Sequence, residues 1–145
     1  NTRIPVGDAS ILVHPLDAST KAGITGVSFF SDQGRKVTQL NGLNVVADLK
    51  VPSSVEADVS LDHVAIGVLD LEDSVGAWAA RIGLEPEFVG IHPVSSGTLR
   101  VARFCLGDRM IELLSPVPGK PSAIRDRLER VGESPFAVAL PAKNL

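Results

Sequence analysis

Short runs in which apolar residues alternate with small or polar ones dominate this chain, and two stretches of helical spacing interrupt them. Residues 61–68 alternate strictly, so His63 is expected on one face of a strand among small neighbours. Apolar residues then recur at helical spacing over 70–83, with Asp70 as the N-cap. Three strand-like runs follow, at 86–93, 98–107 and 109–116. The pattern predicts one βαβββ module over 61–116.

A second helical pattern lies near the end of the chain. It covers residues 122–132, begins at Ser122 as the N-cap, and leads into the apolar run 136–140. A helix followed at once by a strand is typical of the start of another unit. We therefore interpret residues 117–145 as the helix and first strand of a following module.

The first part of the chain contains further strand-like runs and one short helical segment. The helix is expected over residues 32–43, where Gly34 lies near its start. The polar segment 52–60, "PSSVEADVS", has the composition of a linker. The strand-like runs are 9–15, 23–31 and 44–51.

Two segments about 100 residues apart resemble each other. "GDASILVHP" (7–15) and "GDRMIELLSP" (107–116) both combine a Gly-Asp turn, an apolar strand and a closing proline. This internal repeat predicts that the two strands occupy equivalent places in the fold. Residues 1–51 are then an incomplete first module with late strands and a helix, and the fold class is α+β, with βαβββ modules forming a curved, cup-like mixed sheet.

The composition indicates a globular protein without a polyanionic partner. The chain has 145 residues, of which 44% are hydrophobic, enough to bury a core of ordinary size. A net charge of −3 without a dense Lys or Arg cluster argues against binding to nucleic acid or to a membrane surface. No apolar run reaches the roughly 18 residues that cross a bilayer. The lone Cys105 cannot form an internal disulfide, which favours a reducing, cytoplasmic location.

Four segments carry a resemblance to a known family. "LDHVAIGVLDLEDS", "RIGLEPEF", "GDRMIELLSP" and "AIRDRLERVGE" resemble the vicinal oxygen chelate superfamily, which includes glyoxalases, bleomycin-resistance proteins and dioxygenases. Within that superfamily they are most similar to the methylmalonyl-CoA epimerase branch, over residues 61–141. The resemblance implies two βαβββ modules that curl into a cup with a divalent metal on its floor. It also implies that the first and last strands of each module supply one ligand each.

Two residues match the ligand positions of this family. His63 stands at the first-strand position and Glu112 at the last-strand position of the same module. A carboxylate inside an apolar run needs a compensating cation, which is either a metal ion or an arginine on the neighbouring strand, Arg100 or Arg103. The metals that the resemblance implies are Co, Zn, Mn and Ni. The expected substrate pocket is lined by Ala65, Met110, Leu114 and Arg103.

Other positions depart from the family pattern. Ala137 stands where the next module would supply a histidine, and Gly26 and Ile11 stand at the matching positions of the N-terminal copy. The glutamate base of the epimerases would fall at Ser95 or Ser96. His63 and Glu112 are therefore half of a site, and we expect further residues or a second chain, as in a homo-oligomer, to complete the cup.

Two functions follow from these features. With a complete metal site, we expect an epimerase, an isomerase or a lyase of the glyoxalase superfamily, acting at the α-carbon of a carbonyl substrate such as an acyl-CoA. The alternative is a metal-free, drug-sequestering protein that binds small molecules in the same cup. A structural or assembly module is a third class.

Several conspicuous residues are expected to have structural roles. Trp78 recurs at helical spacing and is expected in the core, and Cys105 is expected to be a small core residue. His14 and His92 precede prolines and are expected in loops.

Overall fold

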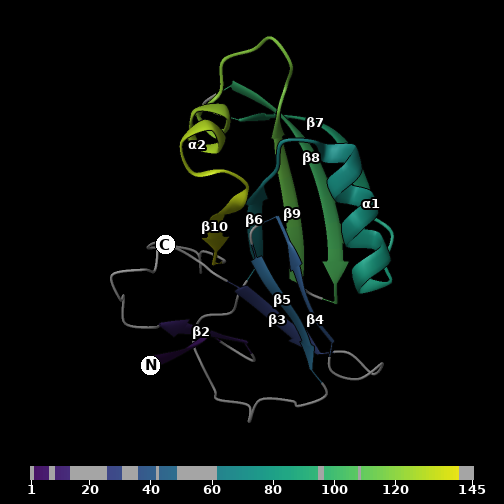
Figure 1. Ribbon diagram of the computed structural model, residues 1–145, viewed down its shortest axis with the longest axis vertical. Helices are drawn as coiled ribbons and strands as arrows, with labels where there is room; N and C mark the ends of the chain where they lie inside the picture. Colours follow the sequence, from purple (N-terminus) through teal and green to yellow (C-terminus); the bar gives the residue numbers. More distant parts are fainter. Residues whose placement is uncertain are drawn as a thin grey trace.

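Figure 1 shows the computed structural model of the chain, in which two helices lie against a curved sheet. The strands that it describes form three sheets, of two, three and five strands. The five-stranded sheet and both helices lie in the part of the chain that resembles the oxygen chelate family. The described residues are 2–6, 9–13, 26–30, 36–41, 43–48, 62–94, 97–107 and 109–140.

The five-stranded sheet has the strand order β10-β6-β9-β8-β7. β6 pairs with β9 in parallel, and the other neighbours are antiparallel. This arrangement confirms the predicted α+β class and the βαβββ order of strands and helix, and β10 extends the sheet beyond β6 (Figure 1). Its strands are β6 (His63–Gly67), β7 (Phe88–Val94), β8 (Gly97–Leu106), β9 (Arg109–Pro116) and β10 (Ser134–Ala139).

Helix α1 (Leu71–Ile82) covers one face of this sheet. The Asp70 carboxylate accepts a hydrogen bond of 3.0 Å from the backbone N–H of Asp73, which is the predicted N-cap. Gly83 ends the helix with a φ of 74°, a left-handed conformation that glycine adopts without steric cost. Trp78 is completely buried, as expected. The core around it contains Val64, Ile66, Val68, Leu71, Ala102, Phe104, Ile111 and Leu113.

Helix α2 (Ala123–Val131) covers part of the opposite face. Its N-cap is Ser122, whose hydroxyl accepts a hydrogen bond from the backbone N–H of Arg125 at 3.2 Å, again as predicted. Figure 1 shows α2 beside the upper part of the sheet, and no other helix among the described residues covers the lower part of this face. The buried cluster beneath α2 consists of Ala65, Leu99, Val101, Leu114, Ile124 and Leu128.

The first part of the chain forms two smaller sheets. β1 and β2 pair antiparallel, and the order of the other sheet is β3-β5-β4. The strands expected over 9–15, 23–31 and 44–51 are confirmed with shorter bounds. The expected linker, 52–60, lies outside the described residues. The strands are β1 (Thr2–Val6), β2 (Ala9–Val13), β3 (Gly26–Phe30), β4 (Lys36–Leu40) and β5 (Leu43–Asp48).

The helix expected over 32–43 is wrong, because β4 occupies residues 36–40. β4 and β5 form an antiparallel hairpin in which Leu40 pairs with Leu43. The Asn41-Gly42 dipeptide between them is the strongest sequence signal for a two-residue hairpin loop, and Asn41 has the positive φ, 47°, that such a loop requires. This local turn chemistry overrides the helical spacing of the apolar residues.

The two segments of the internal repeat do not occupy equivalent places. β2 pairs with β1 in a two-stranded sheet, whereas β9 lies between β6 and β8 inside the five-stranded sheet. The similarity of 7–15 to 107–116 therefore reflects two short apolar strands with similar borders. The division of the chain into modules stays a prediction.

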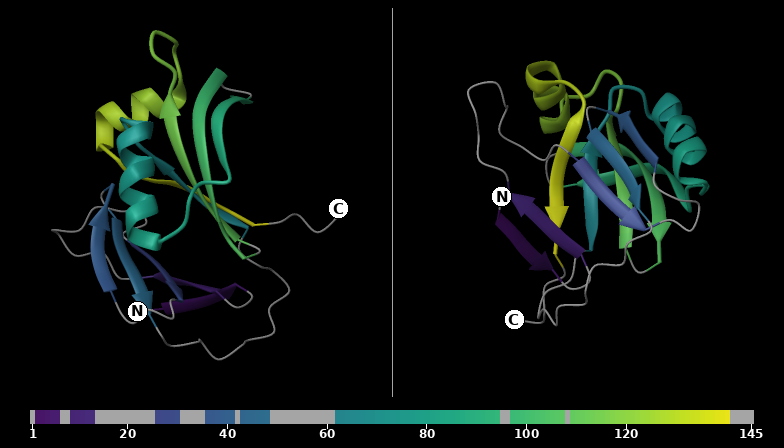
Figure 2. Two further views of the ribbon diagram at one scale, coloured as in Figure 1. Left: turned by 90° about the vertical axis from the view of Figure 1, so that its right-hand side faces the viewer. Right: turned by 60° about the horizontal axis from the view of Figure 1, so that its bottom comes forward.

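Figure 2 shows the β4–β5 hairpin beside α1. Asn41, in the turn of this hairpin, makes the hydrogen bonds to α1. The Asn41 side-chain oxygen accepts a hydrogen bond from the Trp78 indole N–H at 2.7 Å. Its side-chain amide donates to the Ser74 hydroxyl at 3.1 Å and to the Glu133 carboxylate at 3.0 Å. The other Glu133 oxygen accepts from the backbone N–H of Leu69 at 2.7 Å. Asn41 thus satisfies a buried indole and joins the hairpin to α1 and to the start of β10.

None of the helices in the described part of the chain has the length and apolar character needed to cross a membrane.

Candidate metal site

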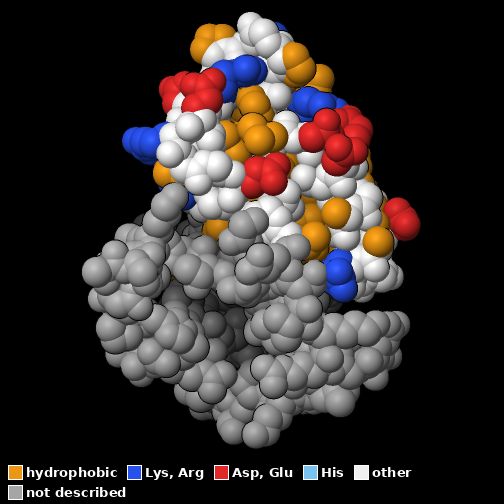
Figure 3. Space-filling model, in the orientation of Figure 1, with side chains coloured by type: hydrophobic (Ala, Val, Ile, Leu, Met, Phe, Trp, Pro, Cys, Tyr) orange, Lys and Arg blue, Asp and Glu red, His pale blue; other side chains and the backbone are white. Residues whose placement is uncertain are grey.

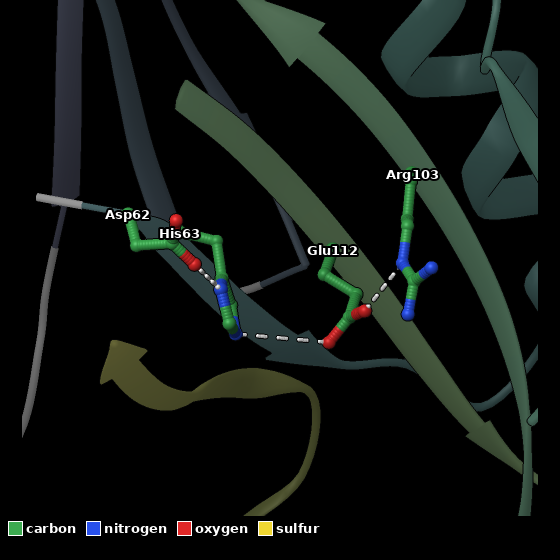
Figure 4. Close-up of polar contacts among 4 residues, drawn as sticks. All are labelled: Asp62, His63, Arg103 and Glu112. Carbon is green, nitrogen blue, oxygen red and sulfur yellow. Dashed lines mark hydrogen bonds and ion pairs between the residues drawn. The ribbon is translucent and has the colours of Figure 1, made fainter. Parts of the chain in front are cut away.

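His63 and Glu112 face each other on the side of the sheet that α2 leaves partly open (Figure 4). His63 begins β6, and Glu112 lies on the adjacent strand β9, where it pairs with Ala65. Because side chains alternate along a strand, His63 and Ala65 share a face with Glu112. The His63 Nε2 and Glu112 Oε2 atoms are 3.9 Å apart. Two ligands of one ion, each about 2.0–2.2 Å from it, lie about 3–4 Å apart.

Asp62 anchors the other nitrogen of the His63 ring. The His63 Nδ1 atom lies 2.7 Å from the Asp62 carboxylate, a short hydrogen-bond distance. The sequence pattern did not predict this contact, although Asp62 and His63 are adjacent in the chain. Consecutive residues of a strand usually point to opposite faces, so strand alternation alone did not predict this contact at the start of β6. The contact leaves Nε2 as the ring atom that faces Glu112.

Arg103 anchors the other oxygen of Glu112. The Arg103 Nε–H donates to Glu112 Oε1 at 2.8 Å, across the pair that β8 and β9 form at these two residues. The Arg103 guanidinium also lies over the Phe88 ring, 5.2 Å from its centre, so its plane is fixed from two sides. Of the two arginines considered from the sequence, Arg103 is the partner of Glu112. Arg100 instead forms an ion pair with Glu72 of α1.

The two anchored side chains are partly shielded from water. The side chains of His63 and Glu112 are 26% and 14% exposed. Asp62 and Glu112 carry two negative charges against the single positive charge of Arg103, so the group has one uncompensated negative charge when His63 is neutral. A cation placed between Nε2 and Oε2 would meet two lone pairs and a net attraction.

The residues expected to line the pocket separate into two groups. Met110 and Arg103 are partly exposed near the His63–Glu112 pair, where Met110 pairs with His63. Ala65 and Leu114 are 3% and 6% exposed and belong to the cluster beneath α2. Both point to the expected face, where α2 covers them, and their place in a substrate pocket stays a prediction.

The remaining positions add no ligand to the pair. Ala137 packs against the cluster beneath α2, and His92 is exposed on β7, where it pairs with Leu99. Ser95 and Ser96 lie outside the described residues, and for Ile11 and Gly26 the structure describes the strand but not the side-chain surroundings. Within the described residues, no group of three His, Cys, Asp or Glu side chains is arranged to hold a metal ion. In this part of the chain the pair therefore offers two donor atoms, fewer than the three or four protein ligands of zinc sites.

Cys105 lies on the same stretch of sheet, where it pairs with Met110. A hydrogen bond with Glu87, together with burial, raises the pKa of the Cys105 thiol above its usual value. The thiol therefore stays protonated at neutral pH, and a protonated thiol is a poor ligand and a poor nucleophile.

Two surface hollows of about 240 and 350 Å³ lie around Leu69, away from the His63–Glu112 pair. The smaller one is bordered by α2, and the larger one by α1 and the Asn41 turn. Figure 3 shows hydrophobic side chains between the helices with acidic and basic ones around them, and no histidine is visible on this face. The lining residues are Leu69, Pro116, Pro118, Arg125, Leu128 and Glu129 for the smaller hollow, and Leu40, Asn41, Leu69, Asp70, Asp73, Ser74, Ala77 and Glu133 for the larger one.

Comparison with known proteins assigns the fold. No family model and no curated protein sequence matches the chain. Solved structures do match, and they show that the chain has the vicinal oxygen chelate fold. A hypothetical protein from Bacillus halodurans C-125 is 26% identical with a TM-score of 0.52, over 61% of this chain and 62% of that one. Methylmalonyl-CoA epimerase from Mycobacterium tuberculosis is 23% identical with a TM-score of 0.53, over 64% of this chain and 62% of that one.

The predicted resemblance is therefore confirmed as a structural similarity to methylmalonyl-CoA epimerases at low identity. The chain spans less than two thirds of the length of either structure.

Proposed function

We propose that the chain is part of a divalent-metal-dependent epimerase or isomerase that acts at the α-carbon of a carbonyl substrate such as an acyl-CoA. The observation that carries the proposal is the His63–Glu112 pair. Each of these residues has one atom bound to a neighbouring side chain, and their remaining donor atoms face each other at 3.9 Å.

The donor set suits the metals that the fold family implies. One imidazole nitrogen and one carboxylate oxygen are ligands that Zn, Co, Mn and Ni accept, and the hydrogen-bonded supports, Asp62 and Arg103, match the outer contacts that usually orient such ligands. His63 and Glu112 would hold two of the coordination positions. The other ligands would come from a second module, supplied by further residues or by another chain.

In the proposed reaction the ion would polarise the substrate, and the residues of the chain would hold the ion and the substrate in place. A bound divalent ion supplies Lewis-acid polarisation of the substrate carbonyl, which makes the adjacent α-proton more acidic. His63 and Glu112 fix the ion on the open face of the sheet. Arg103 keeps Glu112 turned toward His63 and presents a partly exposed guanidinium to an anionic group of the substrate. The acyl-CoA class is suggested by the similar structure, a methylmalonyl-CoA epimerase.

The test combines metal content with proton exchange. Elemental analysis of the purified chain should find about one equivalent of Co, Zn, Mn or Ni per site. In D₂O with added Co²⁺, the α-proton of methylmalonyl-CoA should exchange, followed as loss of its ¹H NMR signal, and EDTA should stop the exchange. Exchange that EDTA leaves unchanged would exclude the metal-dependent reaction.

One observation favours the alternative, a metal-free protein that binds small molecules. Arg103 already compensates the charge of Glu112, so the pair is stable without an ion. In that case elemental analysis finds no metal, and an apolar or aromatic ligand binds on the open face beside Met110 and Phe88 with an affinity that EDTA does not change.

The incomplete site also predicts association of chains. In the described part of the structure, β7 and β10 are the edges of the five-stranded sheet, and Val89 and Ile91 on β7 are 54% and 65% exposed. Unpaired edges with exposed apolar residues promote pairing with another chain. We expect light scattering at about 100 μM protein to give the mass of a dimer or a larger oligomer. A strict monomer at that concentration would mean that no second copy completes the cup.

A further inference from the structure

We propose that Asp62 is a positioning residue that fixes the neutral His63 ring as the Nδ1–H tautomer, so that the Nε2 lone pair is directed toward Glu112. The tautomer follows from contacts within this chain. Its use, to present a ligand to a metal ion, rests on the proposed function.

The two distances at the ring decide which nitrogen carries the proton. Nδ1 lies 2.7 Å from Asp62 Oδ2, which is within hydrogen-bond distance, and an ionised carboxylate can only accept. Nδ1 must therefore be the donor. Nε2 lies 3.9 Å from Glu112 Oε2, too far for a hydrogen bond. Only one of the two carboxylates is placed to accept the ring proton.

The backbone of Asp62 is fixed by both neighbouring strands. Its N–H donates to the Ala139 carbonyl of β10 at 3.0 Å, and its carbonyl accepts from the Met110 N–H of β9 at 3.1 Å. Although the Asp62 side chain is 44% exposed, its Cα atom is tied into the sheet. With the Asp62 backbone fixed, only its side-chain torsions are ordered when the carboxylate binds Nδ1, so the contact costs little conformational entropy.

The other tautomer would leave no lone pair on Nε2 to bind a cation. With the proton on Nε2, the ring would donate toward Glu112, and a shift of about 1 Å would produce a hydrogen bond of ordinary length. A ring in that state has no lone pair at Nε2 for a cation. Arg103 opposes this shift, because its bond to Glu112 Oε1 keeps the carboxylate near β8. Asp62 therefore holds the His63 ring through Nδ1, and Arg103 holds the Glu112 carboxylate through Oε1. Together they prevent a hydrogen bond between His63 Nε2 and Glu112 Oε2.

The test reads the tautomer directly in the metal-free chain of 145 residues. Long-range ¹H–¹⁵N NMR distinguishes the protonated from the unprotonated ring nitrogen, and the same spectra show whether a ring carries one proton or two, so the comparison is made on the singly protonated form. The chain has three histidines, and His63→Ala identifies the His63 signals by their loss. We expect Nδ1–H in the wild type and a shift of the population toward Nε2–H in Asp62→Ala.

Two further variants separate positioning from a structural effect. Asp62→Asn keeps an acceptor oxygen and should keep most of the Nδ1–H form, which is rescue by the conservative change. Asp126→Ala removes an exposed carboxylate from α2 and should leave the His63 signals unchanged. A wild-type ring protonated at Nε2, or an unchanged tautomer in a folded Asp62→Ala, would overturn the proposal.

Metal affinity distinguishes this inference from the proposed function. Calorimetric titration with Co²⁺ should show binding about 10–100-fold weaker in Asp62→Ala than in the wild type, the usual effect of removing an outer partner of a ligating histidine. If the tautomer changes but the wild type binds no Co²⁺, Asp62 still positions His63 and the metal proposal fails. If Co²⁺ binds equally to both proteins, Asp62 does not prepare the ring for a metal.

Discussion

Replacing His63 with Ala should abolish Co²⁺ binding and α-proton exchange while leaving the fold intact. The side chain is 26% exposed at the start of a strand, so its removal takes little apolar area from the core. It removes one of two donors, however, and the remaining carboxylate is already bound to Arg103. We expect calorimetry to detect no Co²⁺ binding by this variant, with a circular dichroism spectrum and a urea midpoint close to those of the wild type.

His92→Ala is the matched control for this experiment. His92 is an exposed histidine on β7 of the same sheet, opposite Leu99, and belongs to neither cluster of buried residues. Its loss should change neither metal affinity nor exchange. If His63→Ala binds Co²⁺ as tightly as His92→Ala does, His63 is not a ligand. If His63→Ala is strongly destabilised but its folded fraction retains exchange, His63 is a packing residue and the proposal of a metal site on this face is wrong.

Replacing Asn41 with Ala should destabilise the chain by about 2–3 kcal/mol, because it leaves the indole N–H of a completely buried tryptophan without its partner. The variant also removes donors from Ser74 and Glu133. Urea unfolding followed by tryptophan fluorescence measures the loss, since Trp78 is the sole tryptophan in the sequence and lies at the contact.

A double-mutant cycle isolates the indole bond from the rest of the change. Trp78→Phe removes the N–H while keeping an aromatic ring, so Asn41→Ala should cost about 1–2 kcal/mol less in the Trp78→Phe background than in the wild type. Circular dichroism replaces fluorescence in this background. Equal costs in the two backgrounds would show that the Asn41–Trp78 contact contributes nothing to stability.

The sequence contains most of the information for the five-stranded sheet, because the signals there are local. Asp70 and Gly83 mark the ends of α1, and the strict alternation of 61–68 places His63 on the correct face. The alternation of side chains could also have predicted that one of the two arginines, Arg100 or Arg103, is excluded as the partner of Glu112. Residues three apart in a strand point to opposite faces, so only one of the two can share the face of Glu112.

What the sequence did not reveal depends on contacts between distant segments. Ala65 and Leu114 have the alternation of pocket residues, but the position of α2 above them buries them. The helix expected over 32–43 is wrong because the Asn41-Gly42 turn favours a hairpin more strongly than the spacing of the apolar residues favours a helix. The role of Asn41 could not be predicted at all, since its partners lie 33 to 92 residues further along the chain.

Asn41 joins segments that lie far apart in the chain. It contacts Ser74 and Trp78 of α1, 33 and 37 residues away, and Glu133 beside β10, 92 residues away. These three contacts exist together only when α1 and the start of β10 are both in place. We therefore expect the β4–β5 hairpin to dock, during folding, onto elements that have already formed.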